Sequence, residues 1–250
     1  MITTKDILDF LDCNAPISDA CEWDNCGLLC GDKTQKVKKV MLCLDITKAV
    51  VKDAIDSGCE LIISHHPLIF SPLRSIEKDS VLYDLIKAGI SAICMHTNLD
   101  IAQDFGVNET LAKALSLNST VLYKDDFLCV GKLQNPMDSE SFANYVKKHL
   151  NCKGVRYTNG SDISTVAVSS GAGSDAVEKM LDYNIDALVT GEIKHHHFLY
   201  ANEHSLCVVE AGHFNTEVIV TDSLKALLKS RFSDIEFVKS KAECDPVSFA

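Results

Sequence analysis

Short apolar runs alternate with helical segments along this chain, and that alternation is what most restricts its fold. The runs at 37–44, 61–64 and 90–95 have the length and composition of strands, and apolar residues recur at helical spacing in 48–57 and 80–88 between them. Consecutive strands separated by helices pair in parallel, because each helix carries the chain back across the sheet. The pattern therefore predicts a parallel sheet covered by helices.

A second series of the same kind follows a helix expected at 108–115. It has strands at 127–133, 165–169, 187–190 and 206–211 and helices at 139–150, 174–183, 193–202 and 216–230. The polar, turn-rich stretch from Asn118 to Asp126 is the candidate boundary. We therefore expect two similar α/β domains, residues 1–123 and 124–250, and we leave open that the last helix and a strand at 235–238 pack back on the first.

The charge balance argues against a nucleic-acid partner, and the lengths of the apolar runs argue against a membrane. The chain has 24 Lys and Arg against 35 Asp and Glu, a formal charge of −11 that is wrong for neutralising nucleic-acid phosphates. No apolar run approaches the ~18 residues of a membrane span. Because the first residues also lack the layout of a signal peptide, we expect a cytoplasmic protein with no membrane or nucleic-acid partner.

Eleven cysteines do not indicate a disulfide scaffold. An odd number cannot pair completely within one chain, and a density of about 4% is low for such scaffolds. Cys21, Cys26 and Cys30 are spaced somewhat like metal ligands, but no second pair follows. We expect free, structural thiols.

Side chains that can bind metal follow four of the expected strands. They are His65 and His66, then His96 and Asp100, then Glu192, and finally His213 and Glu217. Ligands of open α/β sheets bind outside the carboxyl ends of the strands. The site is therefore expected at these strand ends.

The spacing within this group favours two metal ions. Adjacent residues such as His65 and His66 point in different directions, so they suit two neighbouring ions better than one, although a buried, hydrogen-bonded pair is an alternative for these two alone. Asp100 and Glu217 can bridge ions, and His213 lies four residues before Glu217. Three imidazoles and two carboxylates suit Zn, Fe, Mn, Co or Ni.

Five sequence blocks give the chain a resemblance to a known family. They are Trp-Asp-Asn-Cys-Gly-Leu-Leu-Cys-Gly (23–31), Ser-His-His-Pro-Leu-Ile-Phe (64–70), His-Thr-Asn-Leu-Asp with Gly-Val-Asn (96–100, 106–108), Thr-Gly-Glu-Ile-Lys-His-His (190–196) and Gly-His-Phe-Asn-Thr-Glu (212–217). These blocks resemble, in order, those of the NGG-one-interacting-factor-three-like family, also called GTP cyclohydrolase I type 2 homologues.

The resemblance implies two similar α/β domains, a dinuclear metal site in the cleft between them, and a ring-shaped homohexamer. By motif, the implied metal ligands are His65, His66, Asp100, His213 and Glu217. Longer members of the family carry an inserted domain for which 250 residues leave no room, so the chain resembles the short form.

The expected chemistry is hydrolysis. Two divalent ions contribute a charge of +4 and two carboxylates contribute −2, which leaves a net charge of about +2. This charge favours a small anionic substrate such as a nucleotide or another phosphorylated molecule. His96 and Glu192 are candidates for proton transfer, or equally for orienting the ligands. The alternative function is a non-catalytic metal-binding protein, either a metal carrier or insertase or a regulatory subunit.

Other features keep two interpretations. Successive residues of a helix diverge by about 100°, so of His195, His196 and His197 we expect one to line the site and the others to be surface or interface residues. The turn at 171–173 could hold a phosphate with backbone amides or be a plain strand-to-helix turn. Trp23 is expected to anchor a core or a subunit contact rather than to stack on a substrate base.

Overall fold

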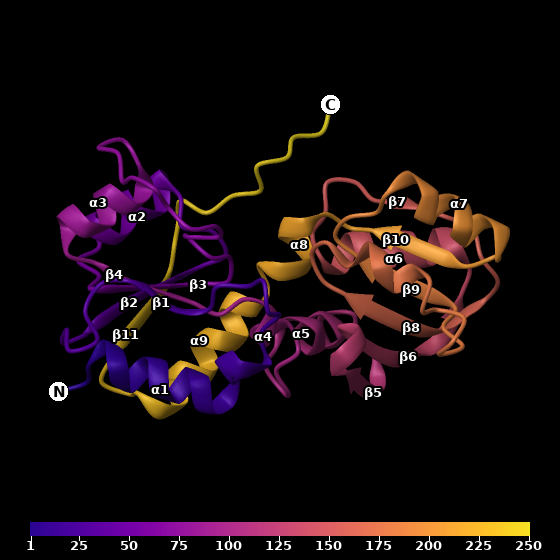
Figure 1. Cartoon of the computed structure of the whole chain (residues 1–250). Helices are drawn as coiled ribbons and strands as arrows, with labels where there is room; N and C mark the ends of the chain where they lie inside the picture. The colour runs from indigo at the N-terminus through magenta and orange to yellow at the C-terminus, as the bar shows by residue number, and fades with distance from the viewer. The chain divides into compact units, whose positions relative to one another are not determined.

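The computed structural model describes residues 1–250 and divides the chain into two compact units (Figure 1). The first unit contains Met1–Ala102 and Thr221–Cys244, and the second contains Gln103–Val220 and Asp245–Ala250. The first crossing between units thus falls at residue 102 rather than at the expected 123. The reason is that residues 118–123 form a strand that pairs within the second sheet instead of a boundary turn.

The first unit is built around a five-stranded sheet. Its elements are α1 (Thr4–Asn14), η1 (Ile17–Asp19), β1 (Gly27–Cys30), β2 (Lys39–Cys43), α2 (Lys48–Asp56), β3 (Leu61–Ser64), α3 (Val81–Ala88), β4 (Ser91–Cys94), α4 (Thr97–Asp100), α9 (Val220–Arg231, starting at the unit boundary) and β11 (Glu236–Lys239). The strand order is β1-β4-β3-β2-β11, and only the edge strand β1 is antiparallel to its neighbour.

Helices cover both faces of this sheet. Figure 1 shows α2 and α3 on one side and α1 and α9 on the other. On the α2 side, Met41 and Ile62 pack with Val50 and Leu85 in one buried cluster. The last strand of the sequence, β11, lies parallel to β2, with Phe237 opposite Val40. A segment near the end of the chain therefore completes the first sheet.

The second unit has a six-stranded sheet. Its elements are α5 (Val107–Ala114), β5 (Asn118–Tyr123), η2 (Lys124–Asp126), β6 (Leu128–Met137), α6 (Ser139–His149), β7 (Arg156–Tyr157), β8 (Ile163–Ser169), η3 (Gly173–Val177), β9 (Ala187–Thr190), α7 (His195–Glu203), β10 (Cys207–Glu210) and α8 (His213–Glu217). The order is β5-β6-β8-β9-β10-β7. Only β8, β9 and β10 pair in parallel, whereas β5, β6 and β7 are antiparallel additions.

Alternation along β8 distributes the core of this unit over two faces. Val166 and Val168 pack on one side in the cluster that contains Phe142 of α6. Ala167 points to the opposite side, into the cluster that contains Val177 of η3. This period of two is what the pleat of a strand imposes on a sheet covered on both faces.

Two expected helices differ in the structure. The segment 174–183 forms the short 3-10 helix η3 followed by turns, with i→i−3 bonds such as that from Met180 N–H to the Val177 carbonyl. Its apolar residues are buried as expected, because spacing predicts burial and not the hydrogen-bond type. The segment 216–230 is two helices, α8 and α9, and α8 already starts at His213. None of the helices is long and apolar enough to cross a lipid bilayer.

We expect Phe237→Ala to destabilise the first unit by roughly 3–5 kcal/mol, because a buried ring of β11 is removed from the sheet. Hydrogen exchange followed by mass spectrometry should show faster exchange in β2 and unchanged exchange in β8. Phe249→Ala, at a ring that is 55% exposed, is the control. Equal acceleration in β8 would contradict the assignment of β11 to the first unit.

Candidate metal centre

The first unit brings three imidazoles together at one edge of its sheet. His65 and His66 directly follow β3, and His96 follows β4. Because β3 and β4 are parallel neighbours, their carboxyl ends lie at the same edge. The potential ligand atoms of His65, His66 and His96 lie within 4.8 Å of one another. Three rings from two strand ends thus form one group.

Each of these rings is held by an oxygen acceptor at Nδ1. The partners are the Met95 carbonyl for His65 (3.0 Å), Asp45 for His66 (2.8 Å) and Asp24 for His96 (2.9 Å). An oxygen acceptor requires a hydrogen on Nδ1, so Nε2 of the neutral ring carries the lone pair. Metal-ligating histidines are fixed in the same way.

Asp24, the acceptor for His96, is held by several hydrogen bonds. Its side chain is 0% exposed and accepts hydrogen bonds from His96, from the Thr97 backbone N–H and from the Thr97 hydroxyl. Burial by itself would raise the pKa of the Asp24 carboxyl, but the hydrogen bonds from His96 and Thr97 outweigh burial and hold that pKa well below its usual range. Asp24 therefore remains an ionised acceptor at neutral pH.

The second unit places a histidine and two carboxylates at an edge of its own sheet. His213 begins α8 and Glu217 ends it, so the two side chains lie one helical turn apart. Glu192 follows β9, the parallel neighbour of β10. Its Oε1 lies 2.8 Å from His213 Nδ1, so Glu192 orients this ring as Asp24 orients His96.

The donor atoms fit a metal ion. With Nδ1–H bonded to an oxygen, the Nε2 lone pair of His213 faces Glu217 Oε2 at 2.9 Å, and that of His65 faces Asp100 Oδ1 at 3.5 Å. Two electron-rich atoms at such distances need a cation or a proton between them. Ligands at about 2.1 Å from a shared ion and at right angles to each other are ~3 Å apart, so both pairs suit a divalent metal.

Glycines let the backbone approach Glu217. Gly171 has φ +58°, and a Cβ there would lie 2.1 Å from Glu217 Oε1. A Cβ on Gly191 would lie 2.5 Å from the Gly171 carbonyl oxygen. The amides of Ser170 and Gly171 donate to Asn108 and Thr216, respectively. These two amides are therefore committed to side chains of the unit, and the turn at 171–173 supports Glu217 by close packing.

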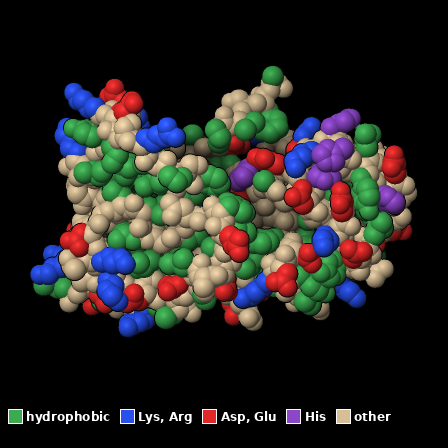
Figure 2. All heavy atoms as spheres, viewed as in Figure 1, with side chains coloured by type: hydrophobic (Ala, Val, Ile, Leu, Met, Phe, Trp, Pro, Cys, Tyr) green, Lys and Arg blue, Asp and Glu red, His purple; other side chains and the backbone are tan.

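The three consecutive histidines do not join this arrangement. His195 and His196 are exposed, and Figure 2 shows histidine side chains gathered on the surface in the region of α7. His197 is buried, which lowers its pKa, and its Nε2 lies 4.0 Å from Glu178. None of the three belongs to a candidate metal group, so the expectation that one of them lines the site finds no support.

The cysteines are free, as expected. Burial raises the pKa of Cys59 to about 11 and that of Cys129 to about 12, so these thiols stay protonated at neutral pH. Cys26, from the spacing that resembles a metal cluster, contacts Asp24 and Asn98 through its sulfur. Thiolate ligation is therefore not favoured.

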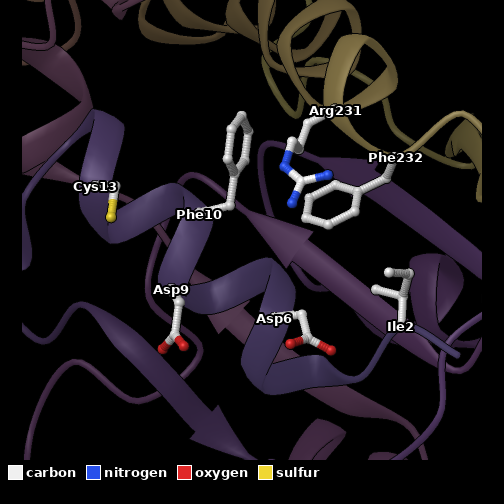
Figure 3. A pocket seen from close by; sticks show the side chains of 7 residues that line it. All are labelled: Ile2, Asp6, Asp9, Phe10, Cys13, Arg231 and Phe232. Atoms are coloured by element: carbon white, nitrogen blue, oxygen red, sulfur yellow. The ribbon is translucent and has the colours of Figure 1, made fainter.

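A pocket elsewhere in the first unit has no comparable chemistry. Its volume is about 320 Å³, and Figure 3 shows Phe10, Arg231 and Phe232 gathered between α1 and the end of α9. Asp6 caps α1 through Thr3, and Asp9 pairs with Lys5. Its carboxylates thus serve the helix rather than a ligand.

Asp24 and Asp45 hold two imidazoles of the candidate site, and the sequence pattern does not single them out. Asp24 lies inside the block 23–31, which carries a resemblance but no ligand spacing, and Asp45 directly follows an expected strand. The position of Asp45 after a strand was a usable signal. The pairing of Asp24 with His96 spans 72 residues and carried no local signal.

We expect Gly171→Ala to weaken metal binding by at least tenfold, because the new Cβ collides with Glu217. Gly58→Ala is the matched control, since Gly58 has a similar φ of +68° but open space around its Cβ position. Both variants should lose about 1–2 kcal/mol of stability from backbone strain. Calorimetric titration with Zn²⁺ or Mn²⁺ separates them, and equal affinities would contradict the packing role of Gly171.

We expect Asp24→Asn to lower the free energy of unfolding at pH 7 by roughly 1.5–3 kcal/mol, because charge-assisted hydrogen bonds are lost. The depressed pKa of Asp24 gives stability that is fully present above the unfolded value of ~3.9 and is lost as pH falls through the folded value. The difference in the free energy of unfolding between wild type and variant should therefore become smaller below about pH 4.

Denaturant unfolding at pH 7, 5 and 3 measures this gap. Asp9→Asn, at an exposed carboxylate paired with Lys5, serves as control and should cost less than about 1 kcal/mol. A gap for Asp24→Asn that is as large at pH 3 as at pH 7 would argue against the ionised, hydrogen-bonded Asp24.

Relatives of the chain share its whole length. A GTP cyclohydrolase 1 type 2 homolog of Clostridium perfringens is 32% identical and aligns over 98% of both chains. NGG1-interacting factor 3 of Saccharomyces cerevisiae is 32% identical, over 91% of this chain and 90% of the yeast protein.

Solved structures agree with the fold. Staphylococcus aureus protein SA1388 superposes with a TM-score of 0.93 at 28% identity, over 100% of this chain and 99% of that one. Reduced HcgD from Methanocaldococcus jannaschii has a TM-score of 0.80 at 31% identity, over 95% and 97%. The family model for Duf34/NIF3 (NGG1p interacting factor 3) matches residues 2–246. The chain therefore belongs to the Duf34/NIF3 family, as its sequence blocks indicate.

Proposed function

We propose that this protein is a dinuclear metal-dependent hydrolase acting on a small anionic substrate such as a nucleotide. The observation that carries the proposal is the hydrogen-bond pattern that four imidazoles share. His65, His66, His96 and His213 each have Nδ1 within 3.0 Å of an oxygen acceptor, so Nε2 of each neutral ring carries the lone pair. Oxygen acceptors at Nδ1 fix metal-ligating histidines in the same way, and four rings held so are hard to explain by packing alone.

The proposed ligands come from both units. His65, His66 and Asp100 belong to the first unit, and His213 and Glu217 to the second. Catalytic zinc ions usually have three protein ligands and an open position. Five side chains serving two ions, with the carboxylates able to bridge, leave positions for substrate and water. This openness favours turnover over storage.

When bound, two divalent ions would supply positive charge for an anionic substrate and lower the pKa of a water molecule. The relatives' name, GTP cyclohydrolase 1 type 2 homolog, agrees with a nucleotide-like substrate. By simple counting, the ions and the two carboxylates leave a charge of about +2, which attracts an anion within a protein of net charge −11.

Proton transfer is assigned to His96. Its Nδ1–H is held by Asp24, so Nε2 can receive a proton, and the ionised Asp24 then stabilises the imidazolium. Glu192 is assigned the role of orienting a ligand, because its carboxylate already accepts a hydrogen bond from His213 Nδ1. We therefore propose that Glu192 positions a ligand and transfers no proton.

We expect His65→Ala or Glu217→Ala to lose at least one metal ion while keeping the fold, because the sheets position the ligands. Elemental analysis after metal-controlled purification measures the content, and circular dichroism checks the fold. His197→Ala is the control, a buried histidine outside the candidate groups. Full occupancy in both ligand variants would refute the ligand set.

We expect His96→Gln to retain its metal and to lose about 10²-fold or more in kcat, as removal of a general acid or base does. A panel of phosphatase, nucleotidase and cyclohydrolase substrates, with and without chelator, tests the activity on the assembly as purified, which we propose is a homohexamer. Metal-loaded protein without turnover of any substrate would favour the carrier or regulatory function. Loss of metal in His96→Gln would make His96 a ligand.

A further inference from the structure

Two large aromatic rings are exposed side by side in the first unit. Trp23, the only tryptophan of the chain, is 59% exposed, so it does not anchor the core of its unit. Phe70 is 57% exposed, and the ring centroids of Trp23 and Phe70 are 5.7 Å apart with the planes tilted by 42°. The two rings thus form an open corner with aromatic surface facing solvent. Exposed neighbouring aromatics often mark a binding site.

This aromatic corner borders the imidazole group. The Trp23 ring meets the His96 ring edge to face, with centroids 6.1 Å apart. His96 in turn lies 5.2 Å from His65 and 5.5 Å from His66, centroid to centroid. A molecule that places an anionic group at the imidazoles can therefore reach the corner with an adjoining part.

Polar contacts on both sides fix the corner in place. Next to Trp23, Asp24 is bonded to His96 and Thr97. The Asn25 amide donates to the Ile69 carbonyl at 2.6 Å, which ties the segment after Trp23 to the residue before Phe70. A backbone held in this way on both sides needs little ordering on binding, which favours affinity. The corner is thus preorganised.

The size of the corner selects its occupant. Whole Trp and Phe side chains offer roughly 150–250 Å² each, so the exposed parts sum to on the order of 250 Å². A stable protein interface buries about 800 Å² per partner. The corner is too small to hold a second protein chain by itself, but it suits one planar ring of a small molecule.

We propose that Trp23 and Phe70 bind the planar heteroaromatic ring of the substrate by stacking, beside the group that receives its anionic part. This subsite rests on the proposed function, since it assumes that the imidazole group takes the anion. Stacking on aromatic side chains tolerates any base because every base has a π-face. The structure thus predicts affinity for ring-bearing phosphates as a class.

Trp23 itself reports the binding, since no other tryptophan contributes to the emission. Metal-loaded full-length protein is titrated with guanosine monophosphate and, separately, with ribose 5-phosphate, which has the phosphate and sugar but no base. We expect guanosine monophosphate to quench Trp23 fluorescence saturably and to bind about tenfold or more tightly than ribose 5-phosphate. Calorimetry supplies both affinities independently of the fluorescence.

Phe70→Leu should weaken the binding of guanosine monophosphate about tenfold, as loss of one stacking partner does. The affinity for ribose 5-phosphate and the metal content should stay unchanged. Phe249→Leu, at a ring equally exposed in the second unit, is the control and should change neither affinity. Equal affinities for the two phosphates in the wild type, or no difference between Phe70→Leu and Phe249→Leu, would overturn the proposal.

Two further outcomes separate this inference from the proposed function. If the protein binds metal and binds ribose 5-phosphate as tightly as guanosine monophosphate, the stacking subsite is refuted and the hydrolase proposal is unaffected. Quenching by guanosine monophosphate in protein that binds no metal would support the subsite and refute the metal centre. Trp23 emission that is blue-shifted and moves to the red on dilution would place the corner in a contact between copies of the chain, against the proposal.

Discussion

Parallel strand pairing is the constraint on which the candidate site depends. Neighbouring parallel strands end at the same edge, so residues that follow them in sequence come together although they lie far apart along the chain. Pairing of β3 with β4 unites His65 and His66 with His96, and pairing of β9 with β10 unites Glu192 with His213. In each unit the buried, rigid sheet thus serves as the support for polar groups at its rim.

Oxygen acceptors orient these candidate metal ligands. A ring at a strand end can rotate and change tautomer, and one hydrogen bond at Nδ1 removes both freedoms. The protein uses a backbone carbonyl for His65 and carboxylates for His66, His96 and His213. The partner of His96 is the ionised Asp24, whose side chain is fully buried.

Close packing positions the proposed carboxylate ligand of the second unit. Glu217 is 4% exposed, and a buried carboxylate is costly unless charge or hydrogen bonds compensate for the lost water. His213 and the tightly turned backbone at Gly171 surround it, which leaves no room for a side chain at that glycine. The glycines that suggest a phosphate loop in the sequence are therefore required by contact with a side chain 46 residues further on.

The sequence by itself determined the two α/β units, most strands and helices, and the strand ends at which metal-binding residues gather, because burial period and chain order are local properties. It could not place the first crossing between units, since β5 is an edge strand that begins with polar residues and is recognised by its pairing with β6. It also could not assign Asp24 to His96 or explain Gly171, because those contacts join distant segments. Only the tertiary structure decided which oxygen fixes each imidazole, because hydrogen bonds depend on distances that sequence spacing does not encode.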